Sequence, residues 1–131
     1  GEKRMNELTK GHPTDAGIDI ALEKDVHIPA HSGVTIELSV ANLDLPAFTA
    51  GFIFIRSKWA HLPILIQNPP IDAHYTGPLH VWVHNFSDED IVLFGGTAYF
   101  QLVVFKIIHP ALPNVEIKDY RPRAAERDTT R

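Results

Sequence analysis

The feature that most constrains this chain is how often it is interrupted by turns. Stretches such as IPAHSG, NPP, YTGP and FGG separate apolar segments that have the length of β-strands. Segments of this kind, rich in β-branched and aromatic residues, are typical of strands, whereas a helix needs a longer run with a period of 3.6 residues. The sequence contains no clear run of that second kind. It therefore predicts an all-β fold of the sandwich, barrel or jelly-roll type.

The predicted strands follow from this division of the chain. They cover residues 17–22, 34–38, 51–55, 64–66, 79–83, 91–93 and 98–107. One short helical turn is predicted at residues 57–62, because Ser57 is a good helix cap and Pro63 ends a helix. Residues 68–85 are predicted to form a β-hairpin with its turn at residues 75–78.

Length and composition limit the class of protein. The 131 residues, 44% apolar and 21% charged, have the profile of one globular domain. We expect this β domain to cover residues 1–120 and a charged tail to follow at residues 121–131. The formal charge of −4 argues against a general DNA or RNA binder, because phosphate contacts require a basic surface.

The chain contains no cysteine, which excludes disulfides, thiolate metal sites and a cysteine nucleophile. Its apolar runs are too short to span a bilayer, and its charged start lacks the apolar core of a signal peptide. We therefore expect a cytoplasmic protein that does not interact with membranes.

Eight histidines raise the question of a metal site. His80 and His84 are four residues apart, but they lie in LHVWVHN, which alternates like a strand. In a strand they would be separated by about 13 Å, too far for one ion to bridge. The other histidines share no spacing, so surface positions are the favoured interpretation. The sequence also lacks a nucleophile elbow and a Walker-type glycine loop.

Four short segments carry the chemistry that remains, and their order is informative. They are PTDAGIDI at residues 13–20, FIRSKWA at 54–60, NPPIDAHYTGPLHVWVHN at 68–85 and GGTAYFQLVVF at 95–105. Each segment alone has an ordinary structural explanation, such as a capping aspartate in the first or a hydrogen-bonded strand glutamine in the last. An arginine beside the amides of a helical turn in the second segment suits a phosphate.

In this order the four segments resemble the first four of the five motifs of the trimeric dUTPase (deoxyuridine 5'-triphosphate nucleotidohydrolase) family. The resemblance covers residues 13–105, and IDAHYTG is similar to the family's isoleucine-aspartate-x-x-tyrosine-x-glycine signature. It implies the dUTPase-like jelly roll, or β-clip, as a homotrimer with sites at the subunit interfaces. It also implies hydrolysis of dUTP to dUMP and pyrophosphate with Mg²⁺, in nucleotide metabolism.

The resemblance implies roles for five positions in particular. Asp72 matches the carboxylate that activates the water for attack on the α-phosphorus. Asp19 matches the aspartate that holds the triphosphate-bound Mg²⁺ through water. Arg56 and Ser57 match the pair that grips the phosphates from a neighbouring subunit. Tyr75 matches the ring that stacks under the deoxyribose and excludes a 2′-hydroxyl.

Three further positions are implied to contact the substrate. Asn68 matches an asparagine near the sugar and base, and Gln101 matches a glutamine near the phosphates. Lys58 stands where the family usually has serine or glycine. Two outcomes are open, added affinity for phosphate or closure of the pocket by the bulk of the side chain, and we expect the lysine to be tolerated. The uracil would be read mainly by backbone groups of residues 71–79, because amide and carbonyl edges need no particular side chain.

Departures from the family pattern keep two alternatives open. The family's fifth motif, a glycine-rich arm, is not found in the sequence, and without it activity would be impaired. The first alternative is therefore a nucleotide-binding or regulatory protein that keeps the fold with little turnover. The second is a dCTP deaminase, which shares the scaffold and is expected to carry a glutamate on the strand after the hairpin. Trp82 and His84 lie on that strand instead, so the deaminase is the least favoured interpretation.

Overall fold

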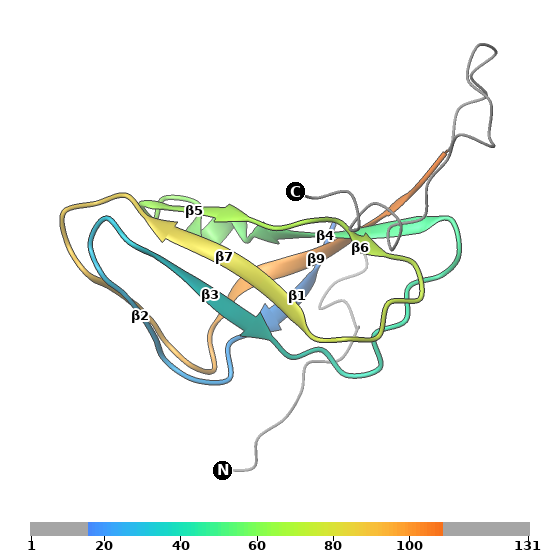
Figure 1. Cartoon of the computed structure of the whole chain (residues 1–131), viewed down its shortest axis with the longest axis horizontal. Helices are drawn as coiled ribbons and strands as arrows, with labels where there is room; N and C mark the ends of the chain where they lie inside the picture. Colours follow the sequence, from blue (N-terminus) through green and yellow to red (C-terminus); the bar gives the residue numbers. More distant parts are fainter. Residues whose placement is uncertain (1–15, 109–131) are drawn as a thin grey trace, which may run out of the picture.

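The computed structural model describes residues 16–108, which form an all-β fold (Figure 1). Its elements are β1 (Ile18–Ala21), β2 (Val26–Ile28), β3 (Gly33–Leu38), β4 (Thr49–Ile55), the 3₁₀ helix η1 (Ser57–Trp59), β5 (Ile64–Gln67), β6 (Ile71–Asp72), β7 (Leu79–Asn85), β8 (Ile91–Leu93) and β9 (Ala98–Lys106). The all-β prediction is confirmed, and each of the seven predicted strands is present with shifted ends or, for β8, with the same ends. Strands β2 and β6 were not predicted.

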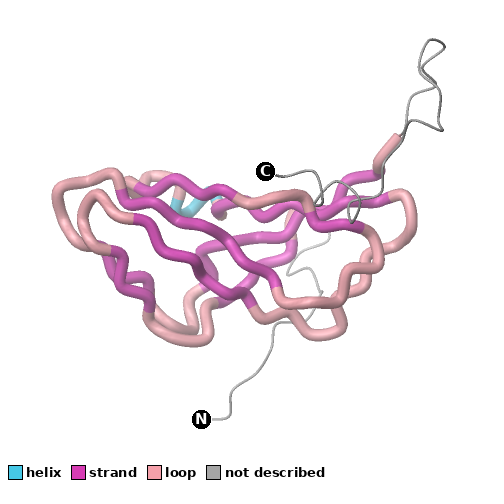
Figure 2. Tube along the Cα trace, viewed as in Figure 1, coloured by secondary structure: helices cyan, strands magenta, loops and turns pink. Residues whose placement is uncertain are grey.

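The strands form two main sheets and one additional strand pair, and all strand pairs are antiparallel. One sheet has the order β1-β9-β4-β6 and the other has the order β3-β7-β5, while β2 pairs with β8. Figures 1 and 2 show the three-stranded sheet crossing over the four-stranded sheet, with η1 as the one helical segment of the described residues. Within those residues no helix is long and apolar enough to cross a membrane.

The core lies between the two layers and follows from the alternation of side chains along the strands. In β7, Leu79, Val81 and Val83 are buried while the residues between them face outward. Phe100 and Leu102 of β9, which belongs to the four-stranded sheet, are fully buried. Burial of such a side chain contributes about 1.5–3 kcal/mol, so these rows of apolar residues hold the sheets together.

The predicted hairpin at residues 68–85 is wrong. Strand β6 pairs with β4, whereas β7 pairs with β3 and β5, so the segment passes from one sheet to the other. Its turn is local: the amide of Tyr75 donates to the carbonyl of Asp72 at 3.2 Å, and His74 adopts a positive φ of 63°. These contacts direct the chain out of the four-stranded sheet after only two residues of β6.

The predicted helical turn is shorter than expected, and its cap is different. Arg56, not Ser57, occupies the N-cap position of η1, and no side chain caps it. Backbone hydrogen bonds of the 3₁₀ type continue to Leu62, the residue before Pro63. The predicted tail at residues 121–131 lies outside the described residues.

Four of the histidines are exposed and pair with carboxylates, which agrees with the predicted surface positions. His27 of β2 contacts Asp90 at 3.0 Å, and His31 of the following loop contacts Asp88 at 2.6 Å. These contacts join β2 and the loop after it to the loop after β7. Hydrogen bonds from the amide of Ala30 and from His27 lower the pKa of Asp90. These pairs are exposed and each contributes little to stability.

Candidate functional site

The residues singled out by the sequence fall into two groups at opposite ends of one sheet. The first group, which we call the ion-pair end, consists of Asp19, Arg56 and Gln101. The second group lines a pocket beside the turn at residues 72–75, which we call the turn pocket.

At the ion-pair end, Arg56 is held from two sides. Its Nε lies 3.0 Å from Oδ1 of Asp19, and its Nη1 donates to the carbonyl of Ala98 at 2.9 Å. The side chain of Arg56 is 31% exposed and that of Asp19 is 53% exposed. An exposed ion pair of this kind contributes at most about 1 kcal/mol, so an incoming phosphate can replace the carboxylate at little cost. The bond to Ala98 keeps the guanidinium in position meanwhile.

Gln101 is the third residue of the ion-pair end and lies on β9, an inner strand of the four-stranded sheet. It lies opposite Asp19 in the β1–β9 ladder, and its Nε2 donates to the carbonyl of Ile55 at 3.2 Å. Its Oε1 lies 2.4 Å from the position that a Cβ on Gly17 would occupy. A side chain at Gly17 would therefore displace the glutamine. The sequence motifs did not single out Gly17 as a site residue.

Ser57 and Lys58 lie on η1 directly after Arg56, and both are exposed. The Nζ of Lys58 lies 5.3 Å from the centre of the Trp59 ring, and Nε1 of Trp59 donates to the carbonyl of Ala98 at 3.1 Å. The tryptophan thus fixes η1 to the same carbonyl that holds Arg56. Arg56, Ser57 and Lys58 follow one another in the chain, and among them Arg56 makes the contact with the exposed carboxylate of Asp19.

The turn pocket has a volume of about 350 Å³ and brings together Asn68, Asp72 and Tyr75. Its other lining residues are Ile53, Pro69, Pro70, Ile71, Pro78, Leu79 and His80. Asp72 and Tyr75 are exposed, whereas Ile71 and Leu79 on either side are buried and anchor the segment in the core. A pocket of this size with apolar walls and a few polar groups is typical of a small-molecule site.

Hydrogen bonds within the turn hold these side chains in place. The hydroxyl of Tyr75 donates to the carbonyl of Pro78 at 2.7 Å, and the ring covers Gly77. The Nδ2 of Asn68 donates to the carbonyl of Ile53 at 2.9 Å. His74 ties the turn to the loop before β4, through its amide to the carbonyl of Leu45 at 3.0 Å. These intramolecular hydrogen bonds therefore fix the shape of the pocket wall.

The strand register places the two groups on the same outer face but far apart. Asp72 is paired with Ala50 of β4, while Gln101 is paired with Phe54 of β4 and with Asp19 of β1. Directly paired residues lie on the same face of a sheet. Ala50 and Phe54 are separated by about 13 Å along the strand, and β1 and β6 are about 14 Å apart across the sheet. Asp72 and Asp19 of one chain are therefore roughly 20 Å apart.

This distance excludes a complete site within one copy. A base and a guanidinium that act on one triphosphate each need to come within about 3 Å of it or of its attacking water. A gap of roughly 20 Å is too large for both contacts on one triphosphate. The structure brings Asn68, Asp72 and Tyr75 together, and it brings Asp19, Arg56 and Gln101 together, but it does not join the two sets.

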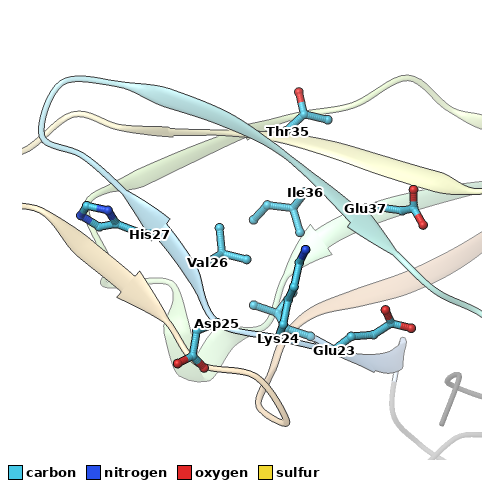
Figure 3. A pocket seen from close by; sticks show the side chains of 9 residues that line it. Glu23, Lys24, Asp25, Val26, His27, Thr35, Ile36 and Glu37 are labelled. Atoms are coloured by element: carbon cyan, nitrogen blue, oxygen red, sulfur yellow. The ribbon is translucent and has the colours of Figure 1, made fainter. Parts of the chain in front are cut away.

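A larger pocket of about 570 Å³ lies elsewhere, between β2 and β3 (Figure 3), and none of the predicted site residues lines it. Val26 and Ile36 face each other across it, and Glu23, Asp25 and Glu37 lie at its rim. Two of these carboxylates serve the fold, because Asp25 accepts from the amide of Gly95 at 2.8 Å and Glu37 pairs with His80 at 3.5 Å. We do not assign the activity to it.

The described residues contain no group of three or more side chains able to hold a metal ion by themselves. Asp19 offers one exposed carboxylate. This arrangement fits Mg²⁺ only as an ion that keeps several waters and shares phosphate oxygens, which is how Mg²⁺ usually binds with nucleotides.

Comparisons with known proteins identify the family. The sequence model of the dUTPase family matches residues 3–129. The chain is 35% identical over 115 residues to the deoxyuridine 5'-triphosphate nucleotidohydrolase of Arabidopsis thaliana. The aligned region covers 85% of this chain and 67% of that protein. It is also 28% identical to part of the Pol polyprotein of an ovine maedi visna related virus, over 75% of this chain but only 9% of the polyprotein.

Solved structures share the fold at lower identity. The native dUTPase of EIAV superimposes with a TM-score of 0.68 and 23% identity, covering 86% of this chain and 97% of that one. The dUTPase of Staphylococcus bacteriophage 80alpha with bound dUPNHPP gives a TM-score of 0.68 and 21% identity, covering 88% and 84% of the two chains. With its dUTPase-like fold and a family match along nearly its whole length, this chain belongs to the dUTPase family.

Proposed function

We propose that this protein is a dUTP diphosphatase, which hydrolyses dUTP to dUMP and pyrophosphate with Mg²⁺ in nucleotide metabolism. It acts as a homotrimer in which the turn pocket of one copy meets the ion-pair end of another. The observation that carries the proposal is that Asp72, Tyr75 and Asn68 line one pocket, on a turn whose shape the chain itself fixes. The family relationship supports the reaction, and the shared lining of this pocket supports the proposed location of the nucleoside.

The nucleoside occupies the turn pocket. The exposed ring of Tyr75 is anchored by its hydroxyl, so it offers a flat, preorganised surface on which the deoxyribose stacks without room for a 2′-hydroxyl. Pro69, Pro70 and Pro78 have no N–H, so they present only carbonyl oxygens and apolar ring atoms to the base. Asn68 uses one amide hydrogen on Ile53 and keeps a second hydrogen and an acceptor oxygen for the sugar or the base.

Asp72 acts as the general base. It takes a proton from a water, the water oxygen forms a bond to the α-phosphorus, and the bond from that phosphorus to the bridging oxygen breaks. Pyrophosphate leaves and dUMP remains. An in-line displacement of this kind requires a positioned water and a base within hydrogen-bond reach. The turn supplies both conditions, because Asp72 is exposed beside the nucleoside pocket and its backbone is fixed.

The ion-pair end of a neighbouring copy holds the phosphates. Arg56 exchanges Asp19 for phosphate oxygens, and Ser57, Lys58 and Gln101 add contacts from η1 and β9. Asp19, released from the guanidinium, would be the residue that holds Mg²⁺ through water. Bound Mg²⁺ would neutralise charge on the phosphates as the pyrophosphate leaves.

A panel of nucleotides tests the proposal. We expect pyrophosphate release from dUTP in the presence of Mg²⁺, and far slower release from dCTP, dTTP and UTP. Binding of dUTP without release of pyrophosphate would contradict hydrolysis and support a regulatory nucleotide-binding protein. Ammonia released from dCTP would indicate a deaminase. We also propose that the protein acts in the cytoplasm on this small-molecule substrate, without a DNA, RNA or membrane partner.

A further inference from the structure

The turn that carries Asp72 and Tyr75 has an unusual backbone conformation at its third residue. The amide of Tyr75 donates to the carbonyl of Asp72 at 3.2 Å, so residues 72–75 form a four-residue β-turn. Its third residue, His74, has a φ of 63°. Glycine or asparagine is the usual residue at a turn position with positive φ, because other side chains adopt this conformation at a cost. The histidine at this position therefore needs an explanation.

The side chain of His74 contacts a loop that is distant in the sequence. Its Nδ1 lies 2.9 Å from Oδ1 of Asp44, in the loop between β3 and β4. The backbone amide of the same histidine donates to the carbonyl of Leu45 at 3.0 Å. A glycine would adopt the backbone conformation of the turn more easily, but it has no side chain to reach the carboxylate. The contact with Asp44 is therefore what the histidine adds to the turn.

The loop that carries Asp44 is anchored in the core beside the turn. Leu43 and Leu45, on either side of Asp44, are 4% and 3% exposed. A Cβ on Gly51 of β4 would lie 2.9 Å from Cδ1 of Leu45 and 3.4 Å from Cβ of Ile71. Leu45 and Ile71 therefore pack against the same glycine, and Ile71 is the residue directly before the turn. The core thus fixes the position of Asp44 relative to the turn.

The contact between Asp44 and His74 is not needed to stabilise the fold. The two side chains are 62% and 64% exposed, and an exposed pair of this kind contributes little to stability. Its effect is local, because a contact at the third residue of a turn restrains the residues at both ends. Those residues are Asp72 and Tyr75, which line the turn pocket. Even a small displacement of a catalytic group lowers the rate of a reaction.

We propose that Asp44 is a positioning residue for the reaction. Through His74 it holds the turn in the conformation in which Asp72 and Tyr75 line the turn pocket. Asp44 does not line that pocket, and it lies outside the four sequence segments that carry the other site residues. The inference rests on the proposed function, because it requires Asp72 to act on a bound nucleotide.

Removal of the carboxylate tests this role. In Asp44→Ala we expect kcat for dUTP to fall by about threefold to tenfold, because the strained turn loses the contact that holds it. The unfolding temperature should stay within about 3 °C of that of the parent, because the lost pair is exposed. The matched control is Asp88→Ala. Its partner His31 also has a positive φ, 55°, and contacts Asp88 at 2.6 Å on loops that carry none of the site residues. This control should keep the kcat of the parent.

Glycine at position 74 separates a positioning role from a general structural one. His74→Ala removes the contact and keeps the cost of a positive φ, whereas His74→Gly removes both. We therefore expect kcat of His74→Gly to exceed that of His74→Ala by about threefold or more. In the His74→Gly background, Asp44→Ala should have no further effect. A further loss in that double variant would overturn the inference, because Asp44 would then act through another residue.

The results also separate this inference from the proposed function. Turnover of dUTP by Asp44→Ala at the rate of the parent would overturn the positioning role and leave the proposed function intact. A parent that binds deoxyuridine without hydrolysing dUTP would contradict the proposed function. In that case the affinity for deoxyuridine should fall in Asp44→Ala and not in the glycine background, and equal affinities would overturn the positioning role. A parent that neither binds deoxyuridine nor hydrolyses dUTP would overturn both.

Discussion

The turn pocket and the ion-pair end belong to the same sheet but are built in opposite ways. The turn pocket is held by backbone carbonyls and prolines, and Asp72 stands on it as a single carboxylate beside apolar walls. The ion-pair end consists of charged side chains that satisfy one another, with Arg56 already paired to Asp19. The first is shaped to receive a flat nucleoside, and the second is arranged to exchange one anion for another.

This difference explains why neither end suffices. The turn pocket has a base and a surface for the sugar, but its described lining contains no arginine or lysine to neutralise a triphosphate. The ion-pair end has the cations, but none of its three residues lines the turn pocket. Because roughly 20 Å separate the two groups within one chain, one nucleotide can contact both groups only if they belong to different copies.

The largest expected effect is the loss of the base at the turn pocket. Asp72→Asn keeps the shape of the side chain but cannot accept the proton of the water, so we expect kcat for dUTP to fall by about 10²–10⁴-fold while the trimer remains. Pyrophosphate release and sedimentation measure the two effects. Asp88→Asn, on the remote loop after β7, is the matched carboxylate control and should retain activity. Unchanged turnover in Asp72→Asn would remove this residue from its assigned role.

The next effect separates the two half-sites. Arg56→Ala should raise KM for dUTP by roughly tenfold to a hundredfold, since a hydrogen bond to a charged group is worth about 1.5–3 kcal/mol. Inhibition by deoxyuridine, which has no phosphate, should not change. Arg56→Lys should recover only part of the loss, because an ammonium cannot make the paired contacts of a guanidinium. An equal loss for dUTP and deoxyuridine would show that the half-sites are not separate.

A smaller effect concerns the sugar surface of the turn pocket. Tyr75→Ala should reduce the preference for dUTP over UTP by about tenfold to a hundredfold in kcat/KM, because the 2′-hydroxyl is no longer excluded. Tyr75→Phe loses only the bond to Pro78 and keeps the ring, so it should retain most of the preference. If both variants discriminate as the parent does, the ring does not select the sugar.

The smallest effect tests how the ion-pair end is positioned. Gly17→Ala should force Gln101 to another rotamer, because the new Cβ would lie 2.4 Å from its Oε1. The affected atom is the end of a flexible side chain, so the fold should remain and KM should rise by about two- to tenfold. Combined with Gln101→Ala, the Gly17→Ala change should have no further effect. An equal additional loss in the double variant would mean that Gly17 acts through another residue.

Local pattern was sufficient for most of the strands. Alternation along LHVWVHN predicted β7, and an apolar run after FGG predicted β9 to within one residue of its end. Two strands were missed for physical reasons. Strand β6 has only two residues and follows two prolines, and β2 has three residues with an exposed histidine at its centre. Such short strands exist because a partner strand pairs with them, which the local sequence does not record.

The proximity of residues within one motif could be predicted from the sequence, whereas the contacts between motifs could not. Motif order grouped Asp72 with Tyr75 and Arg56 with Ser57, and the structure keeps both pairs together. The contact of Asp19 with Arg56 was not anticipated, because it depends on the register of β1, β9 and β4 across the chain. The error about the hairpin has the same origin: a turn such as YTGP looks alike whether it returns a strand to its neighbour or sends it to another sheet.

Mixing two impaired variants, assayed at a dUTP concentration well below the KM of Arg56→Ala, tests the shared site most directly. Asp72→Asn subunits keep an intact Arg56, and Arg56→Ala subunits keep an intact Asp72, so unfolding and refolding them together should create hybrid trimers with complete sites. In an equal random mixture about a quarter of the sites should recover both groups, and activity should return to about that fraction of the parent. Activity that stays at the sum of the two separate variants would contradict a site built from two copies.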